Sequence, residues 1–289
     1  MQLTTVICNY NTRDELAVTL DALITTTGDL THEIIVVDNA SKDGSAAMVR
    51  ERFPTVKVIE SGANLWFTGG NNLGIRAAQG DYVLILNPDA IVQPGALQAM
   101  VDYLDGHPEA GAVTSRQVFS NGTLQRNCSQ LATYTDLLLG YTFLGLLLRG
   151  IRDRRRQKMW YADWDRTTDR PVEVAPDSVL MVRRPILEQI NAFDDDLKLY
   201  FTEDDICYRI RQTGGDVVYV CAAKIVHDEH ASTSQVQRLA THVYFNDLIV
   251  FTRKYYGRWR AWLLAALIMP TRTAMLITQS IKQSTKRTS

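Results

Sequence analysis

The stretch Tyr82-Val83-Leu84-Ile85-Leu86-Asn87-Pro88-Asp89-Ala90 decides the fold of this chain. Five consecutive apolar residues, from Tyr82 to Leu86, are typical of a strand that is buried on both faces of a sheet. Pro88 has no backbone N–H and biases Asn87 towards an extended conformation, so the strand is expected to end there. Asp89 then lies just beyond the carboxyl end of a buried strand, which is where open α/β sheets bind ligands. A carboxylate in this place suits a hard divalent cation that also holds phosphate oxygens, although Asn-Pro-Asp is equally typical of a plain turn.

The residues before this stretch repeat a pattern of strand, polar loop and helix. Further strands are predicted at 3–8, 33–37 and 56–59, and residues 13–26 have helical spacing. Turn-forming residues follow each strand, and the Gly/Asn-rich residues 64–74 are predicted to be a loop that opens a helix. Strands that alternate with helices predict an α/β fold with a mostly parallel, Rossmann-like sheet flanked by helices. The loops then gather along one edge of the sheet, in the crevice expected for a nucleotide.

Gly69 and Gly70 in the third loop are a weak signal for phosphate binding. Glycines let the backbone approach a phosphate at a helix amino terminus. The pair is neither a Walker loop, because no Gly-Lys-Ser/Thr follows, nor a Gly-x-Gly-x-x-Gly fingerprint. The alternative is that these glycines have no part in ligand binding.

Composition limits the class of protein. The chain has 289 residues, enough for one large domain or two small ones, and its formal net charge of -1 gives no overall reason to expect nucleic-acid binding. Its four cysteines are widely spaced without Cys-x-x-Cys, which argues against a zinc site or a disulfide framework and fits a reducing compartment. The amino terminus enters a strand at once, so no signal peptide is expected, and no apolar run reaches the roughly 18 to 20 residues of a spanning helix. These features predict a cytoplasmic protein that is soluble or peripheral on a membrane.

Two apolar segments beside basic residues predict contact with a membrane surface. Residues 136–151 are strongly apolar and are predicted to form one helix, and basic residues follow up to Lys158. Residues 236–289 are predicted to be a helical, basic extension that is broken at Pro270. The extension contains tryptophans and has no acidic residue after Asp247. An apolar helix beside a basic cluster can lie in the interface of an anionic membrane. A core helix, a homodimer contact or a simple basic tail are the alternatives.

The second half of the chain carries a run of acids. Residues 172–182 are predicted to be a strand, after which Thr202-Glu203-Asp204-Asp205 opens a helix. Thr202 with Asp205 three residues later resembles a capping box. Three consecutive acids exceed what capping requires, so some are expected to face the crevice. His227 ends a later strand and can be a metal ligand, although a lone histidine is more often a hydrogen-bonded structural residue.

Taken together, these loops resemble the inverting GT-A glycosyltransferases of family 2, and within that group the rhamnosyltransferase-like branch that builds bacterial cell-surface polysaccharides. The resemblance covers roughly residues 3 to 235 in unbroken order. It implies a GT-A domain over 1–235, with a nucleotide-sugar-binding half (1–118) and an acceptor or catalytic half (119–235), followed by the extension 236–289. The matching motifs are residues 6–11, 36–45, 64–74, 86–90 and 182–184, Phe193-Asp194, and Thr202-Glu203-Asp204.

The resemblance assigns donor-binding roles to side chains in the first half. It implies that Asn9 and Asp38 contact the base and ribose, with Asp38 reading the pyrimidine edge, and that Asn39 also binds the nucleotide sugar. It also implies that Asn64 and Asn72 line the nucleotide-sugar cleft.

The resemblance likewise implies a divalent metal ion, Mn²⁺ or Mg²⁺. Asn87 and Asp89 occupy the places of the family's Asp-x-Asp pair, so Asp89 is expected to ligate the metal and Asn87 to assist on the donor. His227 sits where many relatives supply a further metal ligand. The first acid of the pair is absent here, which leaves the need for metal open.

The general base is expected in Thr202-Glu203-Asp204, which resembles the family's Thr-Glu-Asp motif. Asp204 is the preferred base. Many relatives have one more residue between the acids, and counting back from Arg209 places Glu203 in the catalytic position instead. Pro176-Asp177-Ser178 stands where relatives usually have a glycine-alanine pair beside the acceptor.

The implied activity is metal-assisted transfer of a sugar to a lipid-linked or polysaccharide acceptor at the inner face of the bacterial cell membrane. The expected donor is dTDP-rhamnose, which supplies rhamnose. A metal neutralises the leaving diphosphate, and a carboxylate on the opposite face takes the proton of the acceptor hydroxyl. The alternatives are a UDP-sugar donor (galactofuranose, hexose or N-acetylhexosamine) and a non-catalytic nucleotide-sugar-binding subunit.

Overall fold

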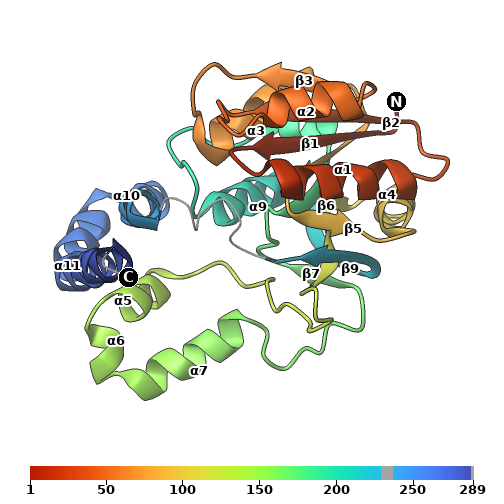
Figure 1. Cartoon of the computed structure of the whole chain (residues 1–289). Helices are drawn as coiled ribbons and strands as arrows, with labels where there is room; N and C mark the ends of the chain where they lie inside the picture. Colours follow the sequence, from red (N-terminus) through yellow and green to blue (C-terminus); the bar gives the residue numbers. More distant parts are fainter. Residues whose placement is uncertain (229–236, 288–289) are drawn as a thin grey trace.

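A computed structural model describes residues 1–228 and 237–287 of the chain (Figure 1). At its centre is a nine-stranded sheet of order β3-β2-β1-β4-β8-β6-β9-β5, in which β7 also pairs with β9. Strands β1 to β4, β6 and β9 run in one direction and β5, β7 and β8 in the other, which confirms the mostly parallel α/β sheet. The strands are β1 (Leu3–Asn9), β2 (His32–Asp38), β3 (Lys57–Glu60), β4 (Tyr82–Leu86), β5 (Ala90–Val92), β6 (Ala110–Val118), β7 (Arg170–Val172), β8 (Val179–Arg183) and β9 (Asp216–His227).

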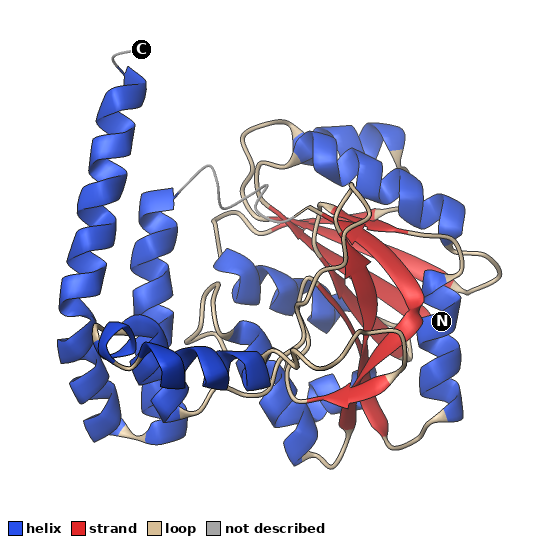
Figure 2. Cartoon of the chain, turned by 90° about the horizontal axis from the view of Figure 1, so that it is seen from below, coloured by secondary structure: helices blue, strands red, loops and turns tan. Residues whose placement is uncertain are grey.

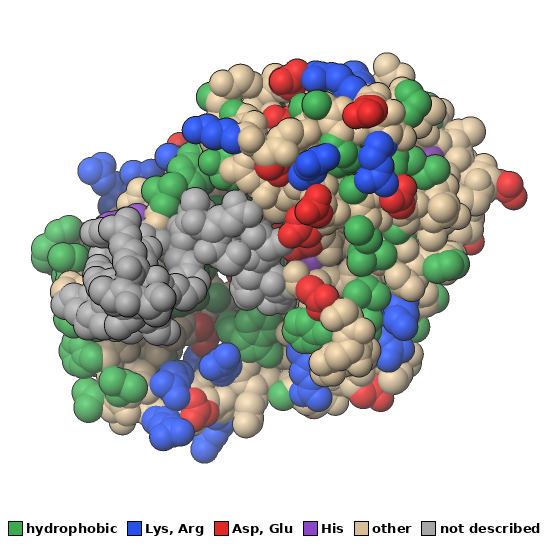
Figure 3. All heavy atoms as spheres, in the orientation of Figure 1, with side chains coloured by type: hydrophobic (Ala, Val, Ile, Leu, Met, Phe, Trp, Pro, Cys, Tyr) green, Lys and Arg blue, Asp and Glu red, His purple; other side chains and the backbone are tan. Residues whose placement is uncertain are grey.

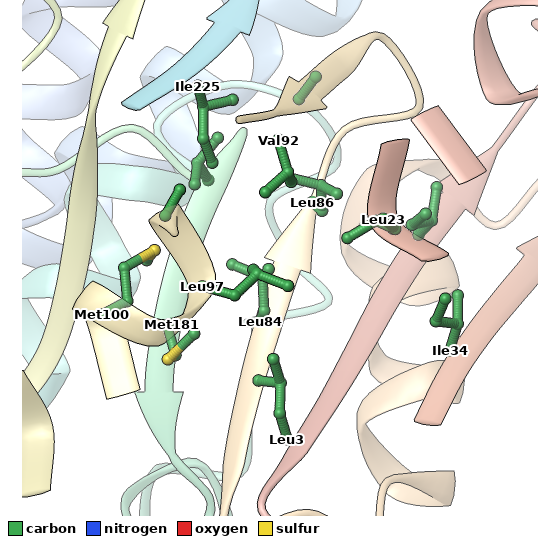
Figure 4. Close-up of a cluster of buried hydrophobic side chains, with 14 of the residues drawn as sticks. Leu3, Leu23, Ile34, Leu84, Leu86, Val92, Leu97, Met100, Met181 and Ile225 are labelled. Atoms are coloured by element: carbon green, nitrogen blue, oxygen red, sulfur yellow. The ribbon is translucent and has the colours of Figure 1, made fainter. Parts of the chain in front are cut away.

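Helices cover both faces of this sheet, as the apolar run in β4 predicts. Every residue of β4 is buried. Leu84 and Leu86 point to one face and pack in the core with α1 (Arg13–Thr26), α2 (Ser45–Arg52) and α4 (Ala96–Gly106), part of which Figure 4 shows. Val83 and Ile85 point to the other face and pack with α3 (Trp66–Ala77), α8 (Arg184–Ile190) and α9 (Thr202–Gln212). Alternate side chains of one strand therefore join two separate cores.

The prediction of a loop over residues 64–74 is wrong, because α3 begins at Trp66. Two of its glycines face the sheet. A Cβ on Gly70 would lie 2.3 Å from the Cys8 Sγ, and one on Gly74 would lie 2.3 Å from the Val6 Cγ1. These glycines let the helix pack closely on β1, so packing rather than phosphate approach accounts for Gly70.

The apolar segment 136–151 is not one helix. It divides among α5 (Tyr134–Tyr141), α6 (Leu144–Leu147) and α7 (Arg149–Met159). Thr133 and Asp136 form a capping box at the start of α5, and the extended backbone of Thr142 ends it. The region of the predicted strand 172–182 also differs, since β7 and β8 are separate and a loop between them carries Asp177.

The carboxyl-terminal extension is helical, as predicted, and consists of α10 (Gln237–Tyr256) and α11 (Arg258–Arg287). These helices stand to one side of the sheet (Figure 2). The predicted break at Pro270 is wrong, because α11 continues through it. None of the helices in the described part of the chain combines the length and the apolar character needed to cross a membrane.

The extension is fastened to the segment that leads into α9. The Asp247 carboxylate in α10 accepts the backbone N–H groups of residues 198, 199 and 200 at 2.9 to 3.1 Å. Asp205 in α9 accepts from Lys254 and from the Tyr255 hydroxyl, each at 2.5 Å. Phe201 and Phe251 stack within a third apolar cluster. The position of the α9 amino terminus therefore depends on α10.

Candidate active site

The acidic run sits at a strained start of α9. Phe201 precedes the helix with a left-handed φ of 60°, a conformation that non-glycine residues seldom adopt. The predicted capping box is wrong: Thr202 is the first helical residue, and its hydroxyl donates to the Asp177 carboxylate at 2.5 Å. Asp205 is buried and pairs with Arg209 at 2.6 Å, so it is structural. Glu203 and Asp204 remain for the crevice.

Glu203 and Asp204 line a cavity of about 390 Å³. Three tyrosines form an aromatic part of its wall, and their rings contact one another or Phe201 at centroid distances of 4.8 to 6.3 Å. Such rings offer flat apolar faces and hydroxyl groups to a sugar. The three tyrosines are Tyr141, Tyr200 and Tyr244, and Trp160, Gln125 and Arg126 also line the cavity.

The acids of this cavity hold their protons unusually tightly. Burial, and then the neighbouring Glu203 charge, raise the pKa of Asp204 to about 8. Burial also raises the pKa of Glu203. Asp177 lies beside the cavity against Thr202, and burial together with the Glu203 charge raises its pKa well above the usual range. A carboxylate whose pKa lies near the working pH is a more effective proton acceptor than an ordinary one. The site is therefore suited to removing a proton from a hydroxyl group.

Asp89 and His227 are brought together by the sheet. Asp89 lies between β4 and β5, and Ala90 in β5 is paired with His227 in β9. The Asp89 Oδ1 and His227 Nε2 atoms are 3.3 Å apart, and the other ring nitrogen of His227 is buried without a hydrogen-bond partner among the described residues. Neighbouring ligands of an octahedral ion, each about 2.1 Å from it, lie about 3 Å apart. The pair therefore fits two ligands of one small divalent cation.

The remaining ligands of such a cation would come from elsewhere. Across residues 1–228 and 237–287, no three or more His, Cys, Asp or Glu side chains gather in a metal-binding group. Two protein ligands leave open positions, which suits an ion bound jointly with phosphate oxygens.

The Asp89–His227 pair and the acidic cavity lie along the same edge of the sheet. The Asn87 N–H donates to the Ser178 carbonyl at 2.9 Å, which places the loop before β8 against the end of β4. The Asp177 carboxylate, one residue before Ser178, accepts a hydrogen bond from the Thr202 hydroxyl at the start of α9. On the other side, Gln125 lines the cavity and donates to the His227 carbonyl at 2.5 Å. Short contacts thus connect the two sets of side chains from both sides.

Four of the predicted donor-binding residues gather at the ends of β1 and β2. Asn9 is paired with Asp38 across the two strands, and both side chains also engage Ser41. The Asn39 amide donates to the Asn64 side chain at 3.2 Å. The structure therefore brings Asn9, Asp38, Asn39 and Asn64 together.

Asn72 is engaged in the protein interior. Its side chain exchanges two hydrogen bonds of 2.9 Å with the Phe193 backbone and donates a third to Asp195. These bonds tie α3 to the loop before α9.

Asp177, Tyr141 and Tyr244 are site residues that sequence reasoning did not single out, whereas Tyr200 was a candidate for stacking on a sugar. Asp177 was visible only as part of a departure from the usual glycine-alanine pair. Its place next to the β4 end follows from the antiparallel pairing of β8 with β4, which no local pattern indicates.

The mostly parallel, nine-stranded sheet with helices on both faces is a GT-A fold, with the carboxylate–histidine pair and the acidic cavity on one edge. Two solved structures share the fold. S. aureus TarS (residues 1-349) aligns with a TM-score of 0.55 and 15% identity, covering 88% of this chain and 74% of that one. GalNAc-T7 with UDP, GalNAc and Mn²⁺ aligns with a TM-score of 0.59 and 15% identity, covering 78% of this chain and 44% of that one.

Sequence comparison gives the family. Residues 4–190 match the model of glycosyl transferase family 2, and the chain belongs to this family. The N-acetylglucosaminyl-diphospho-decaprenol L-rhamnosyltransferase of Mycobacterium tuberculosis is 26% identical over 279 residues, covering 88% of this chain and 86% of the relative. The protein is thus a glycosyltransferase of the rhamnosyltransferase-like kind, which confirms the resemblance noted in its sequence.

Proposed function

We propose that the protein transfers rhamnose from dTDP-rhamnose to the sugar of a lipid-linked diphosphate, with inversion at the anomeric carbon. The observation that carries this proposal is the shared sheet edge of Asp89–His227 and Glu203–Asp204. In-line displacement needs the leaving group and the proton acceptor on opposite sides of one reacting carbon, and the placing of both pairs on one edge of the sheet supports this. The acceptor class follows the name of the mycobacterial relative.

Each half of the GT-A domain has one task in this proposal. The half over 1–118 binds the donor, with Asn9, Asp38, Asn39 and Asn64 as its nucleotide-sugar-binding residues, while Asn72 holds α3 in place through its bonds to Phe193 and Asp195. The half over 119–235 holds the acceptor, and Asp204 takes the proton from its hydroxyl as the new bond forms. Burial, with the Glu203 charge as a second cause, keeps the pKa of Asp204 high enough for that task.

Asp89 and His227 are the proposed ligands of Mn²⁺ or Mg²⁺, with Asn87 beside the donor diphosphate. A divalent cation held there supplies positive charge to the leaving diphosphate. The spacing of the two side chains supports this assignment, and GalNAc-T7, which shares the fold, was solved with Mn²⁺.

A transfer assay tests the donor and the reaction together. Radiolabelled dTDP-rhamnose and a short N-acetylglucosaminyl-diphospho-prenol are the substrates, with UDP-galactofuranose, UDP-hexoses and UDP-N-acetylhexosamines as rival donors. We expect kcat/KM for dTDP-rhamnose to exceed that of every rival at least tenfold, a difference of about 1.4 kcal/mol. A UDP-sugar that is preferred would contradict the donor assignment. Binding of all donors without turnover would identify a non-catalytic subunit.

We also propose that the enzyme lies peripherally on the inner face of the bacterial cell membrane. The contact surface is the apolar tip, defined as Phe143, Leu146, Leu147, Leu148 and Ile151, where Leu146 and Leu147 are 74% and 73% exposed. In Figure 3, Lys and Arg side chains gather beside it, over the lower part of the molecule where α7 lies. Trp259 and Trp262 of α11 are also exposed. Exposed apolar residues beside basic ones support binding to anionic lipid.

Vesicle sedimentation tests this surface. The double variant Leu146→Glu/Leu147→Glu is expected to lower binding to anionic vesicles about tenfold or more, because it removes apolar contact and adds like charge. Val18→Glu is the matched control, since Val18 is an exposed apolar residue of α1. Equal sedimentation of the wild type, the double variant and Val18→Glu would refute the proposal that the apolar tip binds the membrane. Concentration-dependent dimerisation that the double variant abolishes would assign the tip to a homodimer contact instead.

A further inference from the structure

A second cavity, of about 590 Å³, opens beside the acidic one. Arg126 and Trp160 line both cavities, so the two cavities adjoin at these side chains. The remaining lining residues of the second cavity come from α7 and its carboxyl end: Asp153, Arg156, Gln157 and Ala162.

The second cavity has unpaired positive charge. Among the described residues, neither Arg126 nor Arg156 has an ion-pair partner, and both side chains are exposed. The one acid in the wall, Asp153, already pairs with Arg152 at 2.8 Å and with Arg149 at 3.6 Å. Two free guanidinium groups, each able to donate paired hydrogen bonds, favour a ligand with several anionic oxygens such as a diphosphate.

The position of the cavity along α7 also matters. The helix begins next to the apolar tip, where Ile151 is exposed, passes Arg156 in its last turns, and ends at Trp160 on the acidic cavity. With a rise of about 1.5 Å per residue, Ile151 and Trp160 are separated by about 13 Å along the helix. The order is therefore apolar surface, arginine-lined cavity, proton acceptor. A glycosylated polyprenyl diphosphate has the same order: hydrocarbon, diphosphate, sugar.

We propose that the second cavity is the subsite for the acceptor's diphosphate, bound by Arg126 and Arg156. This inference rests on the proposed function, which it extends by assigning the acceptor's anionic group to named residues. The lipid chain leaves the cavity past Ile151 towards the membrane, and the sugar reaches past Trp160 towards Asp204.

Calorimetric titration with geranyl diphosphate, in the presence of EDTA, tests the subsite without the metal-dependent donor site. Arg126→Ala and Arg156→Ala are each expected to raise the Kd about tenfold or more, as the loss of a charge-assisted hydrogen bond does. Arg126→Lys and Arg156→Lys are expected to recover part of the loss. The control is Arg211→Ala, which removes an exposed arginine of α9 outside the cavity and is expected to leave the Kd unchanged. Unchanged melting temperatures verify that each variant is folded.

The outcomes separate this proposal from its rivals. Wild-type affinity in both alanine variants would overturn it. Inorganic pyrophosphate that binds as tightly as geranyl diphosphate would point to a free-phosphate site, and loss of anionic-vesicle binding with unchanged geranyl diphosphate affinity would point to lipid headgroups; either result overturns it. Arginine-dependent binding in an enzyme that transfers no sugar would uphold the subsite and reject the proposed function. If both alanine variants transfer sugar to diphosphate acceptors with the wild-type KM, the proposed function is upheld and the subsite is rejected.

Discussion

Replacing Asp204 by asparagine is expected to lower kcat for sugar transfer about 10³-fold, within the range of a lost general base. Asparagine has the same shape but cannot accept the proton of the acceptor hydroxyl. Donor binding does not need that proton transfer, so the Kd for the nucleotide sugar is expected to stay unchanged. Single-turnover transfer of labelled sugar and calorimetric donor binding measure the two quantities. Near wild-type turnover would remove Asp204 as the base, and a greater loss in Glu203→Gln would transfer the role to Glu203.

The pH profile of the same reaction gives a sharper result. Burial and the Glu203 charge raise the pKa of Asp204 to about 8, so its base form is populated only as pH rises through that value. The kcat of the wild type is therefore expected to increase with pH and to level off above about pH 8. Glu203→Gln removes a like charge, which lowers the Asp204 pKa and moves the midpoint of the profile to lower pH. An unmoved midpoint would contradict the coupling of the two acids.

Stability serves as the control for Asp204→Asn. Because the folded state raises the Asp204 pKa, the stability that the protonated form contributes is present at acidic pH and is lost as pH rises through about 8. Asparagine remains neutral throughout. The variant is thus expected to melt at the same temperature as the wild type at acidic pH and at a higher temperature above pH 8, so lost activity does not reflect unfolding.

Replacing Asp89 by alanine is expected to lower kcat/KM about 10³-fold, which corresponds to about 4 kcal/mol of transition-state stabilisation. The change removes the carboxylate oxygens of the Asp89–His227 pair, which are the ligands that a hard divalent cation prefers. His227→Ala, which leaves the Asp89 carboxylate in place, is expected to cost less. Titration of activity with Mn²⁺ after chelation measures the effect, and both variants are expected to need more Mn²⁺ than the wild type.

Asp14→Ala is the matched control, because Asp14 is an exposed acid on α1. It is expected to behave as wild type. Full activity of the wild type in EDTA, together with full activity of Asp89→Ala, would contradict the metal assignment and leave a mechanism that uses protein charges alone.

The residues that fix the fold and the edge of the site are evident in the sequence. The apolar run of β4 predicts a doubly covered strand, and polar residues after each of the first strands predict the edge where Asn9, Asp38 and Asp89 lie. These signals are local, because strand period and turn chemistry depend on neighbouring residues.

The features that sequence reasoning missed depend on contacts between distant segments. Asp177 reaches Thr202 only because β8 pairs with β4. His227 reaches Asp89 because β5 pairs with β9, and only the family resemblance, not a local pattern, predicted these two residues as a pair. Residues 64–74 look like a loop by composition, yet they form a helix because the small glycines fit against β1. Residues 136–151 have helical composition, and the extended backbone at Thr142 divides them.

The central claim is that a cation at Asp89 and a proton acceptor at Asp204 act on one sugar in one cleft. Crystals of the enzyme with Mn²⁺ and a non-hydrolysable donor analogue, measured for the anomalous scattering of manganese, test it directly. The account predicts an anomalous peak about 2.2 Å from the Asp89 carboxylate, with the donor's anomeric carbon between the metal and Asp204. A peak away from Asp89, or an anomeric carbon turned away from the cavity of Glu203 and Asp204, would contradict it.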